Sequence, residues 1–527
     1  MTLMPKSSRA SAAAVCAALL WSAGATLAAA QTQTVPQTQT QSQILPQVLP
    51  PEAGDTLQSV LASVYRGNPQ LLAERARLRE VDENYVQARA QGRPNLSLSG
   101  SASLQADKGV EGDTPNPFNP NQGEWVGTEP RSAQFNVLQP IYQGGRVKAL
   151  KRQAKAGILA ARAGLDGAEN NVFLSAAQAY VDVLRDEEAA RIRRNNVRVL
   201  TRQLSAADAR FEVGEGTRTD TAQSQSRLAA AEAGLAQADA QLETSRARFV
   251  RLVGRMPNRL QPVPEVALPG SLEAATVLAL ANNPQLLAAY YNELSGEAAI
   301  DVAKAAGRPT VNLQGSVGRS RGSLLGFSDG DQAILGAQLS VPIFSGGANA
   351  SRVRQARHAR TRLGFEARDT ERAVHEAVAQ VWAQLEASRR IVEAGRRQVA
   401  AAETAFEGVE LEQQVGTRTQ LDVLDAEQET LDARLTLIDA QRGFDTAAFQ
   451  LLATIGVFDV DGLNLPVAEY DPDIHLAVAV DDGLKRVADR ILPERLGGGT
   501  TIAGDLRAIE AGIAAPADEP VILIETP

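Results

Sequence analysis

Two kinds of hydrophobic pattern alternate along this chain of 527 residues, in the same order in each half. Apolar residues at helical spacing extend over about Leu57 to Ala90 and again over about Leu272 to Ala306. Each stretch stops at a Gly-Arg-Pro, because proline disfavours helix in the residue before it. The pattern predicts a helix in each half, followed by a change of structure.

Period-two alternation follows each of these helices. The first half contains "NLSLSGSASL" and "SAQFNVLQP", and the second contains "TVNLQGSVG" and "ILGAQLSVP". These predict four strands of roughly ten residues, about the length that a membrane-spanning β-strand needs. The polar loops between the strands of each pair, Asp107 to Arg131 and Arg319 to Asp331, suit the outer face of a barrel.

Long helices come next. Residues 141–256 and 343–465 contain no proline, and a continuous helix over Arg146 to Val213 would be on the order of 100 Å long. Apolar residues within it recur at a 3-4-3-4 spacing, at Val197, Leu200, Leu204, Ala207 and Phe211. The spacing is typical of coiled-coil packing, here between antiparallel neighbours.

These signals belong to one unit written twice. "GNPQLL" recurs as "NNPQLL" 215 residues later, and so does Gly-Arg-Pro. "QPIYQGG" (Gln139 to Gly145) matches "VPIFSGG" (Val341 to Gly347) at an offset of 202, and Val-Gly at 213–214 matches Val-Gly at 415–416 at the same offset. The thirteen-residue difference falls between these two groups of landmarks, where the polar loops lie.

The first thirty residues have the features of a secretory signal peptide: Lys6 and Arg9, then an apolar run, then a small-residue end. A membrane anchor is the alternative. We expect six segments: a signal peptide at 1–30, a Gln/Thr/Pro-rich linker at 31–55, a first repeat at 56–256, a linker at 257–270, a second repeat at 271–457, and an acidic, disordered periplasmic tail at 458–527.

Composition removes several classes of function. Cys16, the only cysteine, lies in the expected signal peptide, so the mature chain would have no disulfide and no thiolate metal site. Removal of the signal peptide leaves 51 basic against 62 acidic residues, a net charge near −11, which makes nucleic acid an unfavourable partner. His358, His375 and His475 lack metal-ligand spacing. With no nucleophile-base arrangement either, we expect no enzyme, no metal and no cofactor.

A membrane role would have to use the strands. After the signal peptide, no segment has eighteen consecutive apolar residues. Four strands cannot close into a barrel, and lipid does not tolerate open sheet edges, so several copies must pool their strands. Two copies would give eight strands and a plugged interior, whereas three would give twelve and an open lumen. With three copies, the tandem repeat would make the assembly pseudo-sixfold.

At this point the residues resemble a known family. The paired "QPIYQGG" and "VPIFSGG" motifs, the "VGEGTRTD" and "VGTRTQLDVLDAEQE" elbows and the closing "QLLATIG" are similar to the TolC family of outer-membrane channel-tunnels, over about Thr56 to Gly456. The resemblance implies a homotrimer with a 12-stranded barrel in the outer-membrane lipid and a periplasmic α-helical barrel. That tunnel would dock through a periplasmic adaptor protein onto an inner-membrane ABC exporter or another efflux pump.

The resemblance implies a passive export duct in the cell outer membrane. The second elbow is most similar to members that serve type I protein secretion, and the chain lacks the lipid-anchor cysteine of the lipoprotein efflux branch. Multidrug or small-molecule efflux is the alternative, since the inner-membrane exporter largely chooses the cargo. A periplasmic coiled-coil adaptor is a more distant alternative, but it would not contain the four duplicated strands.

Two glycine pairs mark the predicted corners between strand and helix. Each follows a proline that ends the strand, and the two glycines permit a sharp turn into the helix. A phosphate-binding loop would need another spacing. The corner residues are Pro140, Gly144 and Gly145 in the first repeat, and Pro342, Gly346 and Gly347 in the second.

The Val-Gly elbows predict tight helix-turn-helix connections in which Thr217, Thr417 or Thr419 caps the new helix. By resemblance, the elbows form the periplasmic tip, where an adaptor contacts the two Val-Gly pairs, Val213, Gly214, Val415 and Gly416.

Asp422 and Asp425 lie on one helix face. In a single chain, such a pair usually lies on a solvent-exposed helix face or places a favourable negative charge near the start of a helix. In a trimer, six carboxylates would surround one axis and attract cations. The resemblance implies that they line the closed entrance, and that Arg418 forms a latch with Thr219 and Asp220. The family often has tyrosine where Gln413 stands.

Overall fold

The computed structural model describes residues 54–108, 125–321 and 330–480. The expected signal peptide and most of the linker at 31–55 lie outside the described residues, as does the tail from 481 onward. All the helices and strands that the structure describes belong to the compact unit that begins at Gly54.

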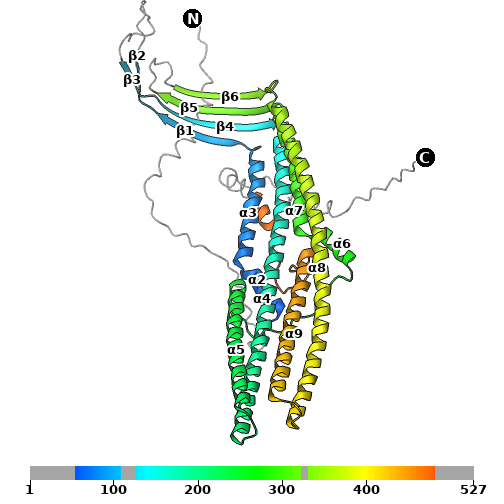
Figure 1. Cartoon of the computed structure of the whole chain (residues 1–527). Helices are drawn as coiled ribbons and strands as arrows, with labels where there is room; N and C mark the ends of the chain where they lie inside the picture. The colour runs from blue at the N-terminus through cyan, green and yellow to red at the C-terminus, as the bar shows by residue number, and fades with distance from the viewer. Residues whose placement is uncertain (1–53, 109–124, 322–329, 481–527) are drawn as a thin grey trace, which may run out of the picture. The chain divides into compact units, whose positions relative to one another are not determined.

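The elements occur in two matching series (Figure 1). The first series is α2 (Leu57–Gly67), α3 (Pro69–Ala90), β1 (Asn95–Ala102), β2 (Gln105–Lys108), β3 (Trp125–Thr128), β4 (Arg131–Gln143), α4 (Arg146–Glu212) and α5 (Arg218–Val253). The second series is α6 (Leu272–Asn282), α7 (Pro284–Ala305), β5 (Thr310–Arg321), β6 (Gly330–Ser340), α8 (Ala348–Gln414) and α9 (Gln420–Ile455).

The first predicted helix of each repeat is in fact two helices. The break falls at Asn68-Pro69 and at Asn283-Pro284, where proline starts the second helix and the asparagine caps it. The Asn68 amide also donates to the carbonyl of Leu252, and the Asn283 amide donates to that of Thr454. Each asparagine therefore ties its break to the end of the last helix in its own repeat.

The predicted long helices are present. α4 and α8 each contain 67 residues, on the order of 100 Å. Each turns at its elbow into a 36-residue helix, α5 or α9, so that every repeat ends in a helical hairpin (Figure 1). Contacts between α4 and α9 join the two hairpins.

Among the residues that the structure describes, no helix has both the length and the apolar character required to cross a membrane.

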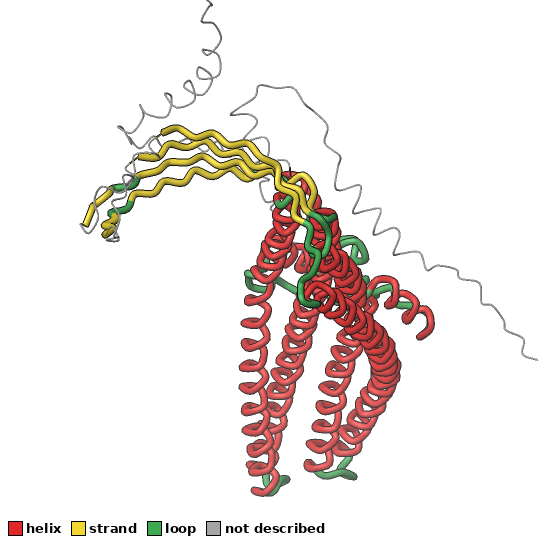
Figure 2. Tube along the Cα trace, turned by 90° about the horizontal axis from the view of Figure 1, so that it is seen from above, coloured by secondary structure: helices red, strands yellow, loops and turns green. Residues whose placement is uncertain are grey.

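The four predicted strands form one antiparallel sheet in the order β1-β4-β5-β6, which curves strongly in Figure 2. Its central pair, β4 and β5, joins the first repeat to the second. The repeats have the same internal register: Asn95 pairs with Leu138, and their equivalents Thr310 and Ser340 pair in the second repeat. The duplicated sequence thus gives a duplicated hairpin.

The register gathers apolar residues on one face of this sheet, because directly paired residues project to the same side. The apolar face contains Leu96, Leu98, Phe135, Val137, Val311, Leu313, Val317, Leu335 and Leu339. The opposite face is mainly serine, asparagine and glutamine, for example Ser99, Gln134, Ser316 and Gln332. Such a two-faced sheet matches a wall with lipid on one side and water on the other.

The first polar loop contains more structure than predicted. β2 and β3 pair antiparallel, and the end of β2 and all of β3 lie in the segment that we expected to be loop. Their four-residue lengths are too short to give a clear period-two signal.

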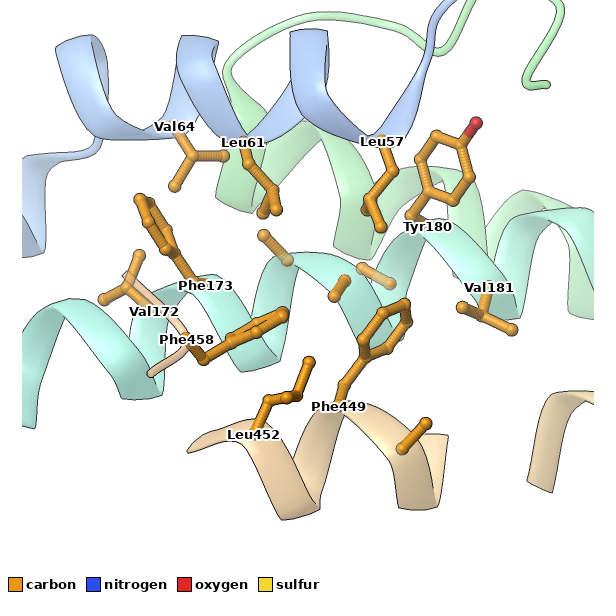
Figure 3. Packing of buried hydrophobic residues seen from close by; sticks show 14 of the residues in the cluster. Leu57, Leu61, Val64, Val172, Phe173, Tyr180, Val181, Phe449, Leu452 and Phe458 are labelled. Carbon is orange, nitrogen blue, oxygen red and sulfur yellow. The ribbon is translucent and has the colours of Figure 1, made fainter. Parts of the chain in front are cut away.

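The main core lies where α2, α4, α9 and the segment after α9 meet (Figure 3). Val64 of α2 lies over the ring of Phe173 of α4, and both are completely buried (Figure 3). Phe458 packs edge-on against Phe173 and tilted against Phe449 of α9. Burial of each large side chain contributes about 1.5–3 kcal/mol, so this cluster fixes the α2 helix against both long hairpins.

The expected disordered tail at 458–527 is wrong for its first part. Residues 458–480 are packed, with Phe458, Leu465 and Leu476 buried, and residues 473–480 are helical. Asp473 is paired with Arg162 of α4, and the His475 Nδ1 lies 3.1 Å from the Asp82 carboxylate of α3. The sequence analysis missed these few buried apolar residues because they are scattered through an acidic stretch outside the repeats.

A buried carboxyl group lies between the two hairpins. Glu427 of α9 is only 8% exposed and accepts a hydrogen bond from the Asn196 amide of α4, while its Oε2 is buried without a partner. It lines a cavity of about 440 Å³ that also contains Glu407 and Glu410 of α8. Burial, with Glu410 nearby, raises the pKa of Glu427 to about 7 despite the Asn196 bond.

Truncation tests the packed segment after α9. A chain ending after residue 480 keeps the buried Phe458, Leu465 and Leu476, whereas one ending after residue 457 loses them. Loss of one such aromatic costs about 3–5 kcal/mol. Circular dichroism melting should show a large drop for the shorter chain alone, and equal melting of the two chains would contradict the packing.

Glu427→Gln tests the carboxyl between the hairpins. A raised pKa means that the folded chain holds this proton more tightly than the unfolded chain, so stability falls as pH rises from about 4.5 to about 7. The variant should match the wild type near pH 4.5 and gain up to about 3 kcal/mol above pH 7. The exposed Glu429→Gln is the control for thermal melting, and a pH-independent difference would disprove the account.

Candidate functional site

The glycine pairs occupy the two turns from strand to helix. Gly144 and Gly145 have φ of +61° and +84°, and Gly346 and Gly347 have +58° and +82°. This left-handed region is strained for residues with a Cβ, so glycine is required. The chain then enters α4 or α8 at once.

The two corner prolines lie just before these turns. The pairing between β4 and β5 shifts register between Pro140 and Tyr142, which leaves a bulge in β4. Pro342 follows the end of β6. The prediction that a proline ends each strand is wrong for Pro140, because β4 continues to Gln143, which pairs with Thr310. Proline cannot donate to the ladder, so Pro140 lies at the bulge and Pro342 lies beyond the end of its strand.

The elbows at the far end have matching backbones. Gly214 and Gly416 have φ of +79° and +81°, and their N–H groups donate to the carbonyls of Phe211 and Gln413. Val213 and Val415 are 71% and 76% exposed. Each elbow therefore presents an apolar side chain at its turn.

Phe211 and Leu411 add to the apolar surface of the elbows, with exposures of 47% and 63%. Sequence reasoning missed them as tip residues because Phe211 continues the helical spacing of the rod. The sequence did contain a signal for these tip residues, because an apolar residue falls in the last helical turn before each Val-Gly.

Thr217 and Thr419 start the returning helices. Each forms a capping box: the hydroxyl accepts from the backbone N–H of the third helical residue, whose carboxylate accepts from the threonine N–H. That carboxylate is Asp220 in the first elbow and Asp422 in the second. Hydrogen bonds from these threonines hold the pKa of both aspartates below its ordinary value. Thr417 is not the cap, and instead donates to the Glu412 carbonyl.

Asp425 lies one turn above Asp422 and pairs with a cation of the other hairpin. Its Oδ1 is 2.6 Å from Nη2 of Arg227 in α5. Both side chains are substantially exposed, so the pair contributes at most about 1 kcal/mol. The contact nevertheless places the predicted constriction residue beside the first-repeat hairpin.

The predicted latch residues do not meet within the single chain. Arg418 pairs with Glu412 of its own hairpin at 2.9 Å. Asp220 bonds to Thr217 through Oδ2, and Thr219 is exposed beside it. The latch between Arg418 and Asp220 stays a prediction.

A polar network that the sequence did not indicate joins the hairpins near their tips. Gln420, the first residue of α9, is 9% exposed and accepts from Nη1 of Arg210 over 3.1 Å. Its amide donates to Gln203 over 3.0 Å, and the Gln413 side chain lies against both Gln420 and Arg210. The partners are about 200 residues apart, so no local pattern could reveal them.

Within residues 54–108, 125–321 and 330–480, no group of three or more His, Cys, Asp and Glu side chains is arranged to hold a metal ion. The features of the site are turns, exposed apolar tips and carboxylates.

Known proteins resemble this chain in sequence. A sequence profile of the family described as "Outer membrane efflux protein" matches residues 60–255 and 275–457. The outer membrane efflux protein BepC of Brucella suis is 32% identical over 434 residues, which is 81% of this chain and 91% of BepC. The alkaline protease secretion protein AprF of Pseudomonas aeruginosa is 29% identical over 304 residues, 56% of this chain and 63% of AprF.

The fold comparison agrees. The CmeC outer membrane channel of Campylobacter jejuni superimposes with a TM-score of 0.65 at 15% identity, over 81% of this chain and 89% of CmeC. The family profile covers both repeats, and BepC aligns across most of its own length. The chain therefore belongs to the outer membrane efflux protein family and is an outer-membrane channel protein whose helical hairpins lie in the periplasm.

Proposed function

We propose that three copies of this chain form the outer-membrane duct of a tripartite type I protein secretion system. Twelve strands would make the barrel and six hairpins would make the periplasmic tunnel. An inner-membrane ABC exporter would supply the energy, and a periplasmic adaptor protein would join it to the tunnel. The duct itself would be passive.

The two-faced sheet with unpaired edges carries this proposal. Within the described residues, β1 and β6 each pair with one neighbour only, so each leaves one row of backbone groups open. An open edge in lipid costs several kcal/mol for each unsatisfied group. Pairing β6 of one copy with β1 of the next would remove both edges, and three copies with four strands each would enclose a lumen.

The exposed elbows support docking of the adaptor. Val213 and Val415 project at the turns, and Gly214 and Gly416 let the backbone approach closely. Apolar side chains exposed at a tip favour contact with another protein. We assign these four residues to the adaptor surface.

The gate would combine a charge ring with a latch. Three copies would bring together Asp422 and Asp425 at the periplasmic entrance, where acidic rings attract cations. Asp220 uses only Oδ2 for its cap, so Oδ1 can accept from Arg418 once Arg418 leaves Glu412. Thr219 would lie beside this contact.

Small-molecule efflux is the second candidate, because BepC, a relative that aligns over most of its length, is named for efflux. Secretion is favoured by the second elbow and by AprF, which is named for protease secretion. The structure of the duct suits both cargoes, so a cargo measurement must separate them.

Single-channel conductance tests the gate. Arg418→Ala should raise conductance severalfold because it removes the latch, with Arg202→Ala as a matched loss of an exposed arginine near the same tip. Asp422→Asn together with Asp425→Asn keeps the hydrogen-bonding shape and removes the charge, so block by divalent cations should weaken. Unchanged conductance and unchanged block would remove the gate hypothesis.

A deletion strain tests the cargo. Type I secretion predicts loss of an abundant protein from the medium without hypersensitivity to antibiotics, measured on the same cultures. Complementation with the wild-type gene is the control. Hypersensitivity with an intact set of secreted proteins would favour efflux and contradict the secretion proposal.

A further inference from the structure

The two repeats of one chain meet at the first corner, and an arginine closes that contact. Nη1 of Arg308 donates to the carbonyl oxygen of Gly144 over 3.1 Å. The fit is close: a Cβ built on Gly144 would lie 2.7 Å from Cβ of Arg308 and 2.8 Å from the carbonyl oxygen of Ala305. The second repeat therefore seals the corner of the first.

The second corner has the same backbone but no such neighbour. Gly346 has φ of +58° against +61° for Gly144, yet a Cβ built on Gly346 would meet no heavy atom within 4 Å. Phe344, two residues before it, is 88% exposed, whereas its first-repeat equivalent Tyr142 is 47% exposed. Exposed apolar surface of this kind marks a contact with lipid or protein.

The first repeat holds an arginine equivalent to Arg308. Arg93 lies 215 residues earlier, and the same turn presents it: its N–H donates to Ala90 over 3.0 Å, as that of Arg308 donates to Ala305 over 3.1 Å. Nη2 of Arg93 is buried against its own chain without a hydrogen-bond partner, so the side chain would gain a bond by turning toward a neighbouring copy. Such an unmade bond is unfavourable. The corner at Gly346 therefore lacks an arginine, and Arg93 lacks an acceptor for its Nη2 group.

We propose that Arg93 of one copy donates to the Gly346 carbonyl of the next copy, as Arg308 donates to Gly144 within a chain. The clamp rests on the homotrimer of the proposed function. A head-to-tail contact of this kind forms a closed ring when its rotation matches the number of copies. All six corners of the trimer would then be sealed in the same way.

The same correspondence gives the register between copies. Within the chain, Leu138 of β4 pairs with Gln314 of β5. Their equivalents are Ser340 of β6, 202 residues later, and Ser99 of β1, 215 residues earlier. The pairing of β4 with β5 can be applied to β6 and β1 because equivalent residues pair within the hairpin of each repeat. We therefore infer that Ser340 of one copy pairs with Ser99 of the next.

This register continues the apolar face across the subunit boundary. It puts Leu339 opposite Gly100 of the next copy. If the shift at the β4 bulge is repeated after β6, Phe344 lies opposite Leu96, as Tyr142 lies opposite Val311 within the chain. Leu96 is 59% exposed in the single chain. A slip of one residue would turn the serines of β1 toward lipid. Phe344 and Leu96 are exposed in the single chain, and contact between them across the subunit boundary would cover both side chains.

Arg93→Ala tests the clamp in the full-length trimer. The variant should dissociate at a lower temperature than the wild type on heated SDS gels, because each subunit boundary loses one hydrogen bond from a charged donor. Arg79→Ala removes an exposed arginine from α3 and should behave as the wild type. An Arg93 that binds lipid phosphate instead would leave trimer dissociation unchanged, and that result would overturn the clamp.

Paired cysteines test the register. The expected mature chain has no cysteine, so Ser99→Cys with Ser340→Cys adds one pair only. Mild oxidation should link the copies covalently. Ser101→Cys with Ser340→Cys is the matched control, displaced by two residues on the same face, and should link far less. Preferential linking of the control would contradict the register.

The two levels of the proposal fail differently. A wild-type chain that stays monomeric in detergent would contradict the trimer and hence the proposed duct. A stable trimer that tolerates Arg93→Ala and does not link through positions 99 and 340 would contradict the clamp alone.

Discussion

The need to satisfy every backbone N–H and C=O group inside lipid governs this structure. A single chain supplies four strands, and β1 and β6 each keep one unpaired edge among the described residues. Lipid offers no hydrogen bonds to such an edge, so the sheet is complete only when copies of the chain join. The apolar face and the polar face suit a wall that another copy continues, and the unbonded Nη2 of Arg93 supports the clamp that we propose there.

The helices of the chain continue that wall into the periplasm. Paired glycines at each corner change a strand into a helix, and the 67-residue helices extend the wall on the order of 100 Å. The core around Phe173, Phe449 and Phe458 holds the short helices and the segment after α9 against these rods. Further along the hairpins, the contacts become polar, with Glu427 bonded to Asn196 and Gln420 to Arg210. Polar contacts of this kind would suit the gate that we propose at this end.

Sequence patterns predicted the elements that are regular and repeated. Period-two alternation found the four main strands, and the duplicated Gly-Gly and Val-Gly motifs found the corners and elbows because glycine there has a positive φ. The Asn-Pro breaks were visible in the quoted motifs but were not interpreted as helix starts. The packed segment 458–480 was missed because its anchors, such as Phe458 and Leu476, are isolated in an acidic stretch. The contacts of Arg210, Arg227 and Glu427 join residues about 200 positions apart, and no single-sequence pattern encodes them.

The central claim is that strands from separate copies form one closed wall. Native mass spectrometry of the complex extracted from outer membranes tests this most directly, because it counts the copies without relying on any variant. The account predicts a single species with the mass of three mature chains that persists when bound detergent is removed. A monomer, or a complex of two copies, would contradict it.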